Sequence, residues 1–440
     1  MSSTTSRAQV FTSQLQHVEK LIGENRLPDA ARMLNTLSRA APTDPRPFLL
    51  GSLMAEVAQN PAGMLTAAKK AVDLAPGWPV ATIRLAGVFS AQAQVELAVT
   101  TAEQAIVEAT RDNTLNSELL TRAAAIAIKS QQYPKAVLWA EQATSLSPGD
   151  SKLQHRYAEA LAFHGQFESA IQIYSSLLEQ DADNKTILFD RLLAYINTSQ
   201  PTLAQHDATQ LLFLEPDNVT YRYYVAMLKG QTPSTQPASV VTHLFDNAAD
   251  DFDDHLQGRL QYTLPQDVAR SILNWYPDKK FDLLDLGCGT GLLGASLGRI
   301  GGVIVGVDLS PNMIAKAAQR GVYAQFNQVN VLDALQHTPD AHYDVITALD
   351  VLVYVGDLTP VIPNAHRILT PGGRFVFSCE AAPIDVDTFA LLDTQRFVHQ
   401  QAYVKQLLQS AGFNDIHIES NVIRLEAGAP VDGFVVTALK

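Results

Sequence analysis

The chain has 440 residues, of which 47% are hydrophobic and 18% charged, and this length and composition are ordinary for a globular protein of two or three domains. Its net charge at pH 7 is −13, and residues 241–440 carry most of it, with 23 acidic and 13 basic side chains. A surface this acidic repels phosphate backbones, so we expect no nucleic acid as substrate or partner.

The expected compartment follows from features that the sequence lacks. Its apolar stretches fall far short of the roughly 20 residues needed to span a bilayer, so no membrane segment is expected. The N-terminus is polar and unlike a secretory signal. The two cysteines, Cys288 and Cys379, suit a reducing compartment and offer no set of zinc ligands. We therefore expect a cytoplasmic protein without a bound metal.

An internal repeat occupies the first half of the chain. Six Ala-rich segments end at residues 42, 76, 110, 148, 182 and 216, so successive ends lie 34 residues apart except for one interval of 38. Compact residues recur twelve positions before each end, at Ala30, Met64, Ala98, Ala136, Ala170 and Ala204. Others recur twenty-four positions before the ends of the middle units, at Ser52, Ala86, Ala124 and Ala158. Such spacing predicts antiparallel helices that approach closely.

This period resembles that of tetratricopeptide (TPR) repeats. The resemblance implies an all-α superhelical array of about six units over residues 1–229. Stacked arrays leave a long concave surface, so we expect a protein or peptide partner there, or self-association of the chain. Residues 230–241 are polar, contain two prolines and follow no helical period, and they are expected to form a linker.

After the linker, apolar runs alternate with helical segments, a pattern that indicates a parallel sheet with crossover helices. The expected strands are 281–286, 303–307, 324–331, 343–347 and 374–378. The expected helices are 292–299, 312–318, 359–369 and 402–411. The last two apolar segments, 415–426 and 431–439, are joined by a turn that contains Gly and Pro, and they predict a hairpin.

A glycine-rich loop, Gly287-x-Gly289-x-Gly291, lies between the first of these strands and the next helix. Glycine allows a tight turn and a close approach of the backbone to a ligand, and the helix N-terminus favours a negatively charged group. Dinucleotide dehydrogenases use a related loop, but with the spacing G-x-G-x-x-G, and Leu292 occupies the place of their third glycine. An acid, Asp308, ends the next strand. A carboxylate at this place can hold ribose hydroxyls, as it does in the dinucleotide dehydrogenases, so Asp308 does not exclude that class.

With Asp333 after the third strand and a Leu-Thr-Pro-Gly-Gly segment at 369–373, residues 281–380 resemble the class I S-adenosylmethionine (SAM)-dependent methyltransferases. The resemblance implies a Rossmann-like seven-stranded α/β domain over residues 242–440 and SAM as the cofactor. It disfavours an NAD-dependent reductase, because both the glycine spacing and the terminal hairpin differ from that class.

The resemblance also implies roles for single residues. Expected cofactor contacts are Gly287, Gly289 and Gly291 at the methionine end, Asp308 and Leu309 at the ribose, and Asp333 and Ala334 at the adenine. Asp285 is expected to orient the loop or the methionine amino group. Two alternatives stay open: Asp333 as a helix cap, and Asp350, after the fourth strand, as a structural residue rather than a contact of the methionine.

Methyl transfer from a sulfonium needs a base only if the nucleophile still holds its proton. The candidates are His255, ahead of the sheet, and His399, after the fifth strand, although a lone histidine is more often simply packed. No Asn/Asp-Pro-Pro-aromatic motif of amino-methylating enzymes follows the fourth strand, and no convincing set of magnesium ligands is present.

The expected function is transfer of a methyl group to an O or N nucleophile of a small-molecule or carrier-presented acceptor, with the repeats recruiting a partner or the substrate. Two alternatives remain. The repeats could grip a polypeptide that is itself methylated, or the chain could be a repeat scaffold whose methyltransferase-like domain is inactive. The intact glycine loop and both downstream acids favour an active domain.

Overall fold

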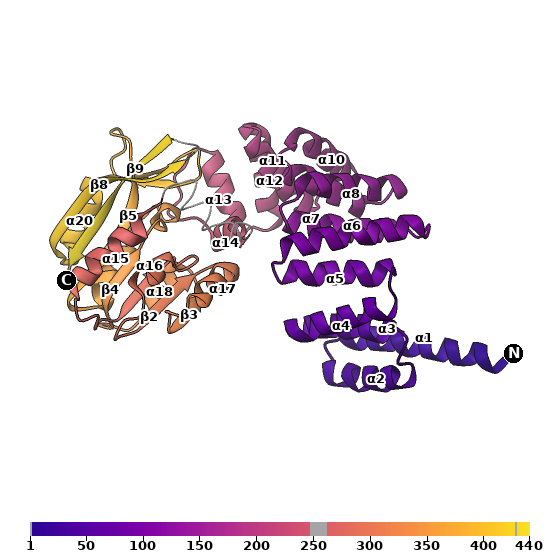
Figure 1. The fold of residues 1–440 in the computed structure, drawn as a ribbon. Coiled ribbons are helices and arrows are strands. Elements are labelled where there is room, and N and C mark those ends of the chain that lie inside the picture. Colours follow the sequence, from indigo (N-terminus) through magenta and orange to yellow (C-terminus); the bar gives the residue numbers. More distant parts are fainter. Residues whose placement is uncertain (1, 247–261, 427–428) are drawn as a thin grey trace. The chain divides into compact units, whose positions relative to one another are not determined.

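The computed structural model describes residues 2–246, 262–426 and 429–440. The chain divides into two compact units, Met1–Leu214 and Glu215–Lys440 (Figure 1). The first unit is entirely helical in its described residues and the second is an α/β unit, so the predicted fold class is confirmed. No helix in the described ranges has the length and apolarity that a bilayer crossing requires.

The first unit consists of helix pairs, each with a short connection. Their bounds are α1 Ser2–Gly23 and α2 Leu27–Ala40, α3 Arg46–Val57 and α4 Pro61–Leu74, α5 Pro79–Ala91 and α6 Val95–Arg111, α7 Ser117–Lys129 and α8 Tyr133–Leu146, α9 Ser151–Phe163 and α10 Phe167–Gln180, and α11 Lys185–Asn197 and α12 Pro201–Leu214. Five of the six predicted repeat ends fall two residues beyond the second helix of a pair, and the sixth, residue 110, falls one residue before the end of α6.

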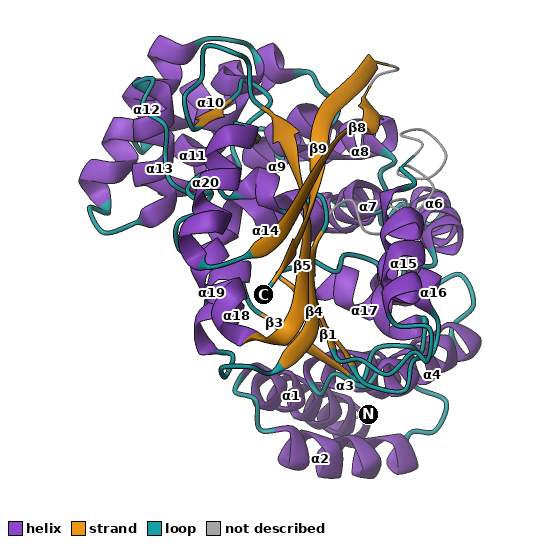
Figure 2. Ribbon diagram, turned by 90° about the vertical axis from the view of Figure 1, so that its left-hand side faces the viewer, coloured by secondary structure: helices purple, strands orange, loops and turns teal. Residues whose placement is uncertain are grey.

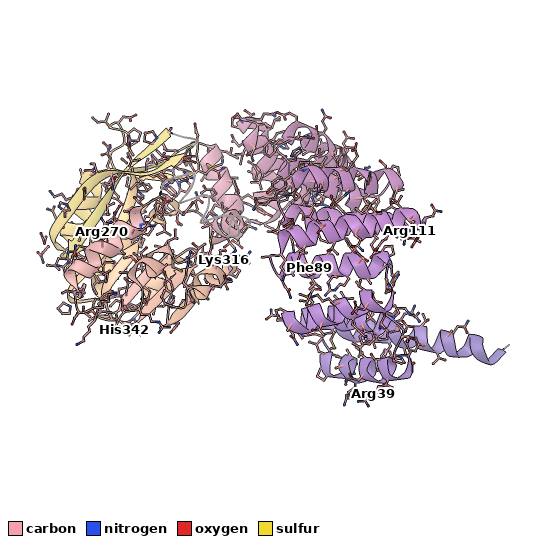
Figure 3. All side chains as sticks on the ribbon, in the orientation of Figure 1. Arg39, Phe89, Arg111, Arg270, Lys316 and His342 are labelled. Atoms are coloured by element: carbon pink, nitrogen blue, oxygen red, sulfur yellow. The ribbon has the colours of Figure 1, made fainter. Side chains whose placement is uncertain are left out.

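The small residues of the repeat lie where two helices meet. All six residues of the first set are buried, and five of them, the alanines, have no exposed surface. Ser52 belongs to the second set, and its hydroxyl donates a hydrogen bond to the carbonyl of Met64 across its pair, at 3.0 Å. Phe89 is buried between helices, whereas Arg39 and Arg111 reach the surface (Figure 3). Close helix contact therefore explains why these positions are small.

The interval of 38 residues also has a structural cause. Helix α6 has 17 residues, whereas α2, α4, α8, α10 and α12 have 14 each. The connection from α6 to α7 then runs to Asn116, whose side chain accepts a hydrogen bond from the Leu119 amide and caps α7. The additional residues thus lengthen one helix and its following turn without breaking the series of pairs.

The second unit is built on a twisted sheet, which Figure 2 shows nearly edge on. Its strands are β1 Leu283–Leu286, β2 Ile304–Asp308, β3 Gln325–Gln328, β4 Tyr343–Ala348, β5 Leu369–Ala381, β6 Phe389–Leu391, β7 Phe397–His399, β8 Asn414–Glu426 and β9 Ala429–Leu439. The order β3-β2-β1-β4-β5 is parallel throughout, and β9 joins β5 antiparallel with β8 outside it. These seven strands form the sheet that the sequence predicts.

Helices cover both faces of this sheet and bury one hydrophobic core on each. The helices of the second unit are α13 Val219–Leu228, α14 Ala238–Asp246, α15 Leu264–Trp275, α16 Leu292–Leu297, α17 Pro311–Gln319, α18 Val331–His337, α19 Val361–Ile368 and α20 Gln401–Ala411, and five of them form the two cores. One core packs α18, α19 and α20 against strands β1, β2, β4, β5 and β9. The other packs α15 and α16 against the opposite face. The sheet is thereby held rigidly, with the carboxyl ends of its parallel strands along one edge.

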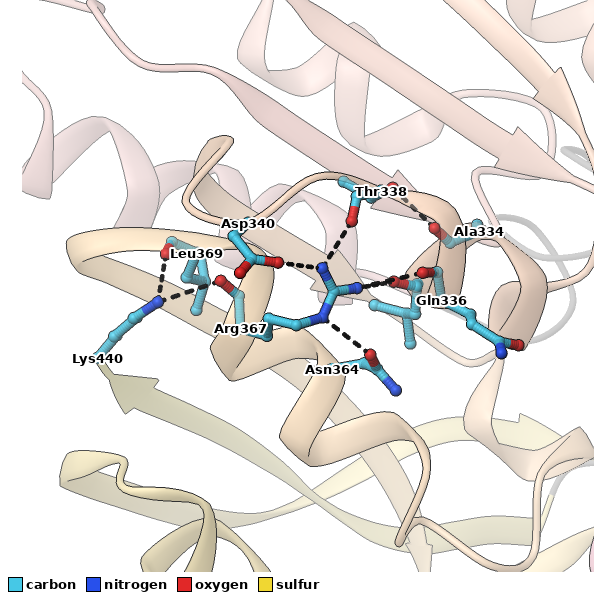
Figure 4. A network of polar contacts seen from close by, with 9 residues as sticks. Ala334, Gln336, Thr338, Asp340, Asn364, Arg367, Leu369 and Lys440 are labelled. Carbon is cyan, nitrogen blue, oxygen red and sulfur yellow. Dashed lines mark hydrogen bonds and ion pairs between the residues drawn. The ribbon is translucent and has the colours of Figure 1, made fainter.

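Helix α19 is joined to the end of α18 by Arg367 (Figure 4). Its guanidinium donates hydrogen bonds to the carbonyls of Leu335 at 2.8 Å, Gln336 at 3.3 Å and Thr338 at 2.8 Å, and it also contacts Asp340. A positive charge at these carbonyls suits the negative end of a helix dipole. The contact fixes the helix that follows β3.

Two features of the second unit differ from the pattern in the sequence. Strands β6 and β7 form a small hairpin that pairs with the end of β5, and neither was predicted. The segment at 230–241, predicted as a linker, contacts the sheet: the Gly356 and Asp357 amides both donate to the carbonyl of Ser234 at 2.9 Å. Thr235 forms a β-bridge with Val355.

Candidate cofactor site

The glycine loop turns sharply from β1 into α16, and its shape requires glycine. Gly287 and Gly291 have φ values of 66° and 82°, in the left-handed region that other residues rarely adopt. A Cβ on Gly287 would lie 2.5 Å from a methyl of Val351, and one on Gly291 would lie 3.2 Å from the Cα of Ala317. The loop is therefore packed closely by the segments after β2 and β4.

Asp285 lies beneath this loop and is buried, with 3% of its surface exposed. Its carboxylate accepts hydrogen bonds from the Tyr323 hydroxyl at 2.6 Å and the Thr347 hydroxyl at 2.8 Å. Burial raises the pKa of Asp285 to about 6, although both hydroxyl donors oppose this rise. The two hydroxyls thus hold the carboxylate in one orientation. Its raised pKa lies closer to neutral pH than that of an ordinary aspartate.

Asp308 ends β2 and faces the glycine loop. One carboxylate oxygen accepts the Gly289 amide at 2.8 Å, and the other accepts the Ser310 amide at 2.9 Å. Ser310 in turn caps α17 by accepting the Met313 amide at 3.1 Å. Since β1 and β2 are neighbours in the sheet, these hydrogen bonds hold the acid beside the loop, as a ligand bridging both would require.

The segment after β3 begins α18 at once. Asn330 is the cap of this helix, because its side chain accepts the Asp333 amide at 2.8 Å. Asp333 therefore lies in the first turn, exposed, with its carboxylate against the Asn330 amide group. Ala334 is buried behind it. Asn330, and not Asp333, is therefore the cap of this helix. The carboxylate of Asp333 lies on the surface, next to the carboxyl end of β3.

A group of buried charges lies at the carboxyl ends of β4 and β5. Arg424 from β8 is only 3% exposed, and it donates hydrogen bonds to Asp350 at 2.6 Å and to Glu380. Arg396 contacts Glu380 at 3.8 Å and donates to Glu426 at 2.5 Å. Burial raises the pKa of Asp350 and of Glu380, while Arg424 counteracts both shifts.

The backbone at Asp350 is unusual. Its φ is 52°, a left-handed conformation that costs energy in a residue with a side chain, and its amide donates to the Ser378 hydroxyl at 2.8 Å. The hydrogen bonds to Arg424 and Ser378 hold it in this conformation. Asp350 thereby presents its carboxylate at the edge of the sheet, between the glycine loop and β5.

His399 lies at the end of β7, with no exposed surface. Its Nε2 is 3.0 Å from the Val355 carbonyl and 2.9 Å from the Gly356 carbonyl, so this nitrogen carries the proton and donates it. Its Nδ1 has no hydrogen-bond partner among the described residues. Burial lowers the pKa of His399 to about 4. The ring thus joins the β6–β7 hairpin to the segment after β4. His255 lies outside the described residues.

Comparison with known proteins identifies the class of both parts. Residues 284–375 match the family model of a methyltransferase domain, and residues 127–194 match that of the tetratricopeptide repeat. The chain therefore carries a SAM-dependent methyltransferase domain C-terminal to tetratricopeptide repeats. The predicted cofactor and the predicted class of enzyme domain are confirmed.

Among curated proteins, a ubiquinone biosynthesis O-methyltransferase of Aeromonas salmonicida is 35% identical over 115 residues, which are 24% of this chain and 48% of that protein. One of Pseudomonas syringae pv. tomato is 32% identical over 121 residues, 26% of this chain and 51% of that protein. The chain thus spans about half the length of these relatives. Among solved structures, the magnesium protoporphyrin IX methyltransferase of Synechocystis PCC 6803 is similar with a TM-score of 0.37 and 18% identity, over 46% of this chain and 99% of that one.

Sequence reasoning did not find several residues that shape the site. Tyr323 and Thr347 hold Asp285 from 38 and 62 positions away, and nothing in the local pattern marks them. Arg424 did leave a signal. It interrupts the apolar run Val-Ile-Arg-Leu in a strand, and a buried position for arginine implies a charged partner.

Proposed function

We propose that this protein transfers the methyl group of SAM to an O or N nucleophile of a small-molecule or carrier-presented acceptor. The observation that carries the proposal is the loop between β1 and α16, with Asp285 held beneath it and Asp308 hydrogen-bonded beside it. The similarity to proteins named as ubiquinone biosynthesis O-methyltransferases supports an oxygen nucleophile on a small molecule.

In this proposal the chain binds SAM along the carboxyl edge of the sheet. Gly287, Gly289 and Gly291 approach the methionine end, and Asp285 holds its amino group or orients the loop. The Asp308 carboxylate, with Leu309 beside it, accepts hydrogen bonds from the ribose hydroxyls, and Asp333 and Ala334 face the adenine. Two charge-assisted hydrogen bonds at the ribose stabilise binding by about 1.5–3 kcal/mol each.

SAM supplies an activated methyl group, so the residues around the acceptor have to align the nucleophile and remove its proton where it has one. Asp350 lies in the segment after β4 and has a pKa raised by burial, which suits a group near the transferred methyl. We propose that Asp350 contacts the methionine or the acceptor. For His399 we propose a structural role, because its protonated nitrogen already donates to two carbonyls. His255 remains a candidate base.

The repeats are proposed to recruit a partner or the substrate. The match to tetratricopeptide repeats supports this, because such arrays carry binding surfaces rather than chemistry. No partner follows from the residues themselves. A polypeptide substrate held by the repeats and an inactive scaffold are the outcomes that the experiment below distinguishes from the proposal.

The test uses SAM labelled in its methyl group, incubated with the full chain and with fractionated lysate of its host. The proposal expects label in a small-molecule or carrier fraction, and none with the Asp308→Ala variant. Asp278→Asn, which changes an exposed acid away from the loop, should retain the transfer. Label in a protein band other than a carrier would favour the polypeptide alternative. No transfer to any fraction would favour the scaffold.

A further inference from the structure

The sheet of the second unit has a strand at each side that is paired on one edge only. Among the described strands, β3 pairs with β2 alone and β8 pairs with β9 alone. The outer edge of such a strand carries backbone N–H and C=O groups that can pair with a further strand. The two edges differ in how strongly their sequences oppose this pairing.

The β8 edge is poorly suited to a further strand. Its pairing with β9 is irregular at two places, one near its start and one toward its end. The side chains of Asp415, His417 and Glu419 are exposed along it. Irregular pairing bends a strand, and charged side chains oppose the approach of another one. We therefore expect no further strand to pair with β8.

The β3 edge is different in composition. Residues 321–332, which include β3, contain no charged side chain and no proline. Gln325 and Gln328 are exposed, and Phe326 and Asn327 between them are half-buried. Since charge and proline are the usual means by which an edge strand avoids pairing, this edge is open to a further strand.

The side chains of β3 alternate between the two faces of the sheet. On one face Phe326 lies over Gly306, where an added Cβ would be 2.8 Å from its ring, and its centroid is 5.0 Å from that of Tyr323. Gln325 and Asn327 point to the other face, where the Gln325 side-chain amide donates to the Asn327 side-chain oxygen at 2.8 Å. A groove of about 580 Å³, bordered by α18, leaves this face of β3 uncovered.

We propose that two copies of this chain associate by pairing their β3 strands antiparallel, about a two-fold axis that passes perpendicular to the sheet at Phe326. Opposite residues of an antiparallel pair lie on the same face of a sheet. With the axis at Phe326, Gln325 of each copy lies opposite the partner's Asn327 on the α18 face. The two Phe326 side chains lie next to each other on the opposite face. The same residues thus contribute from both copies, as a two-fold interface requires.

The distribution of charge favours a second copy as the partner. Residues 241–440 carry 23 acidic and 13 basic side chains, a net charge of −10, so two such units repel each other over most of their surface. Near a two-fold axis, any charge on β3 would also meet its own like charge. The uncharged segment 321–332 avoids this repulsion, and its side-chain amides can both donate and accept hydrogen bonds across the axis. A basic partner would instead need acidic side chains, which this edge lacks.

The test follows the mass of the full chain by sedimentation equilibrium over a range of micromolar concentrations, where the unaltered chain should dimerise reversibly. Gln325→Lys and Gln325→Glu should each weaken dimerisation at least about 10-fold, because the two introduced like charges lie diagonally across the paired strands, about 7–8 Å apart. An equimolar mixture of the two variants should dimerise again, because unlike charges then meet. Glu419→Lys, which changes the β8 edge, is the control and should alter dimerisation by less than about 2-fold.

Gln325 is exposed, so both substitutions should leave the fold intact, which circular dichroism checks. A chain that stays monomeric at every concentration would overturn the inference. A dimer that both Gln325 variants leave unchanged would also overturn it, because that dimer would use another surface. A mixture that stays monomeric while each variant is folded would overturn the pairing about Phe326. Neither SAM nor an acceptor takes part in the measurement, so these outcomes are independent of the proposed function.

Discussion

Replacing Arg424 with methionine should destabilise the second unit strongly, because it removes the cation that two buried carboxylates share. Arg424 is 3% exposed, and the side chains of its partners Asp350 and Glu380 are 20% and 7% exposed. Methionine fills much of the volume, but it removes the ion pair of Asp350 with Arg424 and leaves Glu380 with the more distant Arg396, at 3.8 Å. Breaking a buried ion pair in this way costs about 3–5 kcal/mol of unfolding free energy. Because Asp350 is partly exposed, we expect a value near the lower end, about 3 kcal/mol.

The loss should depend on pH. Burial already raises the pKa of Asp350 and Glu380, and without Arg424 both values rise further. Between the ordinary and the raised pKa the folded chain holds more protons than the unfolded chain, so stability falls as the pH rises through that window. The deficit of Arg424→Met should therefore be largest above the raised pKa values, should shrink as the pH falls through them, and should be smallest well below about pH 4, where the carboxylates are protonated in both states.

The assay measures unfolding in urea through the hydrogen exchange of peptides from the second unit, because the two compact units need not unfold together. Arg270→Met is the control: that side chain is 73% exposed and should change the unfolding free energy by less than about 0.5 kcal/mol. A loss below 1 kcal/mol for Arg424→Met, or a loss that grows on acidification, would refute the reasoning.

Three further substitutions test the site and the helices that hold it. Gly287→Ala should abolish SAM binding in calorimetry, because its Cβ meets a valine side chain at 2.5 Å, whereas Gly298→Ala, with a similar φ of 67° but open space, should retain it. SAM affinity should fall as the pH drops below about 6, because Asp285 then takes up a proton. Tyr323→Phe removes a hydrogen-bond donor to that carboxylate, which raises its pKa, so the fall in affinity should move to higher pH. A SAM affinity that does not depend on pH would count against the role of Asp285. Arg367→Met should cost about 2 kcal/mol in urea unfolding, because three carbonyls at the end of α18 lose their donor, and an unchanged midpoint would contradict this.

The repeats were predictable because their period is long and regular. One small side chain says little, but compact residues every 34 positions have a single physical use, the close contact of paired helices. The glycine loop and the order of strands were equally readable, since both follow from local backbone requirements. The predicted and observed bounds of a strand differ most where no change in the side-chain pattern marks the strand's end. Strand β5 runs from Leu369 to Ala381, whereas only residues 374–378 were predicted.

The remaining features depend on contacts between distant parts of the chain. The position of Arg424 against Asp350 joins residues 74 apart, and the sequence around either one does not reveal the other. His399 looks like a candidate base by residue type alone, and only the fold shows its nitrogen facing two carbonyls. The polar composition of residues 230–241 predicts a linker. The hydrogen bonds that the Ser234 carbonyl accepts and the Gln236 amide donates, both with a distant stretch of backbone, leave no trace in composition.

The most direct test of the central claim, that the loop between β1 and α16 and the adjoining acids bind SAM, is calorimetric titration of SAM into the full chain and its Asp308→Ala variant. The unaltered chain should bind SAM saturably with one site. The variant should keep its fold by circular dichroism and lose at least about 100-fold in affinity, because two hydrogen bonds to a carboxylate are worth about 1.5 kcal/mol each or more. Absence of heat from the unaltered chain at high micromolar SAM, or equal affinity in the variant, would contradict the claim.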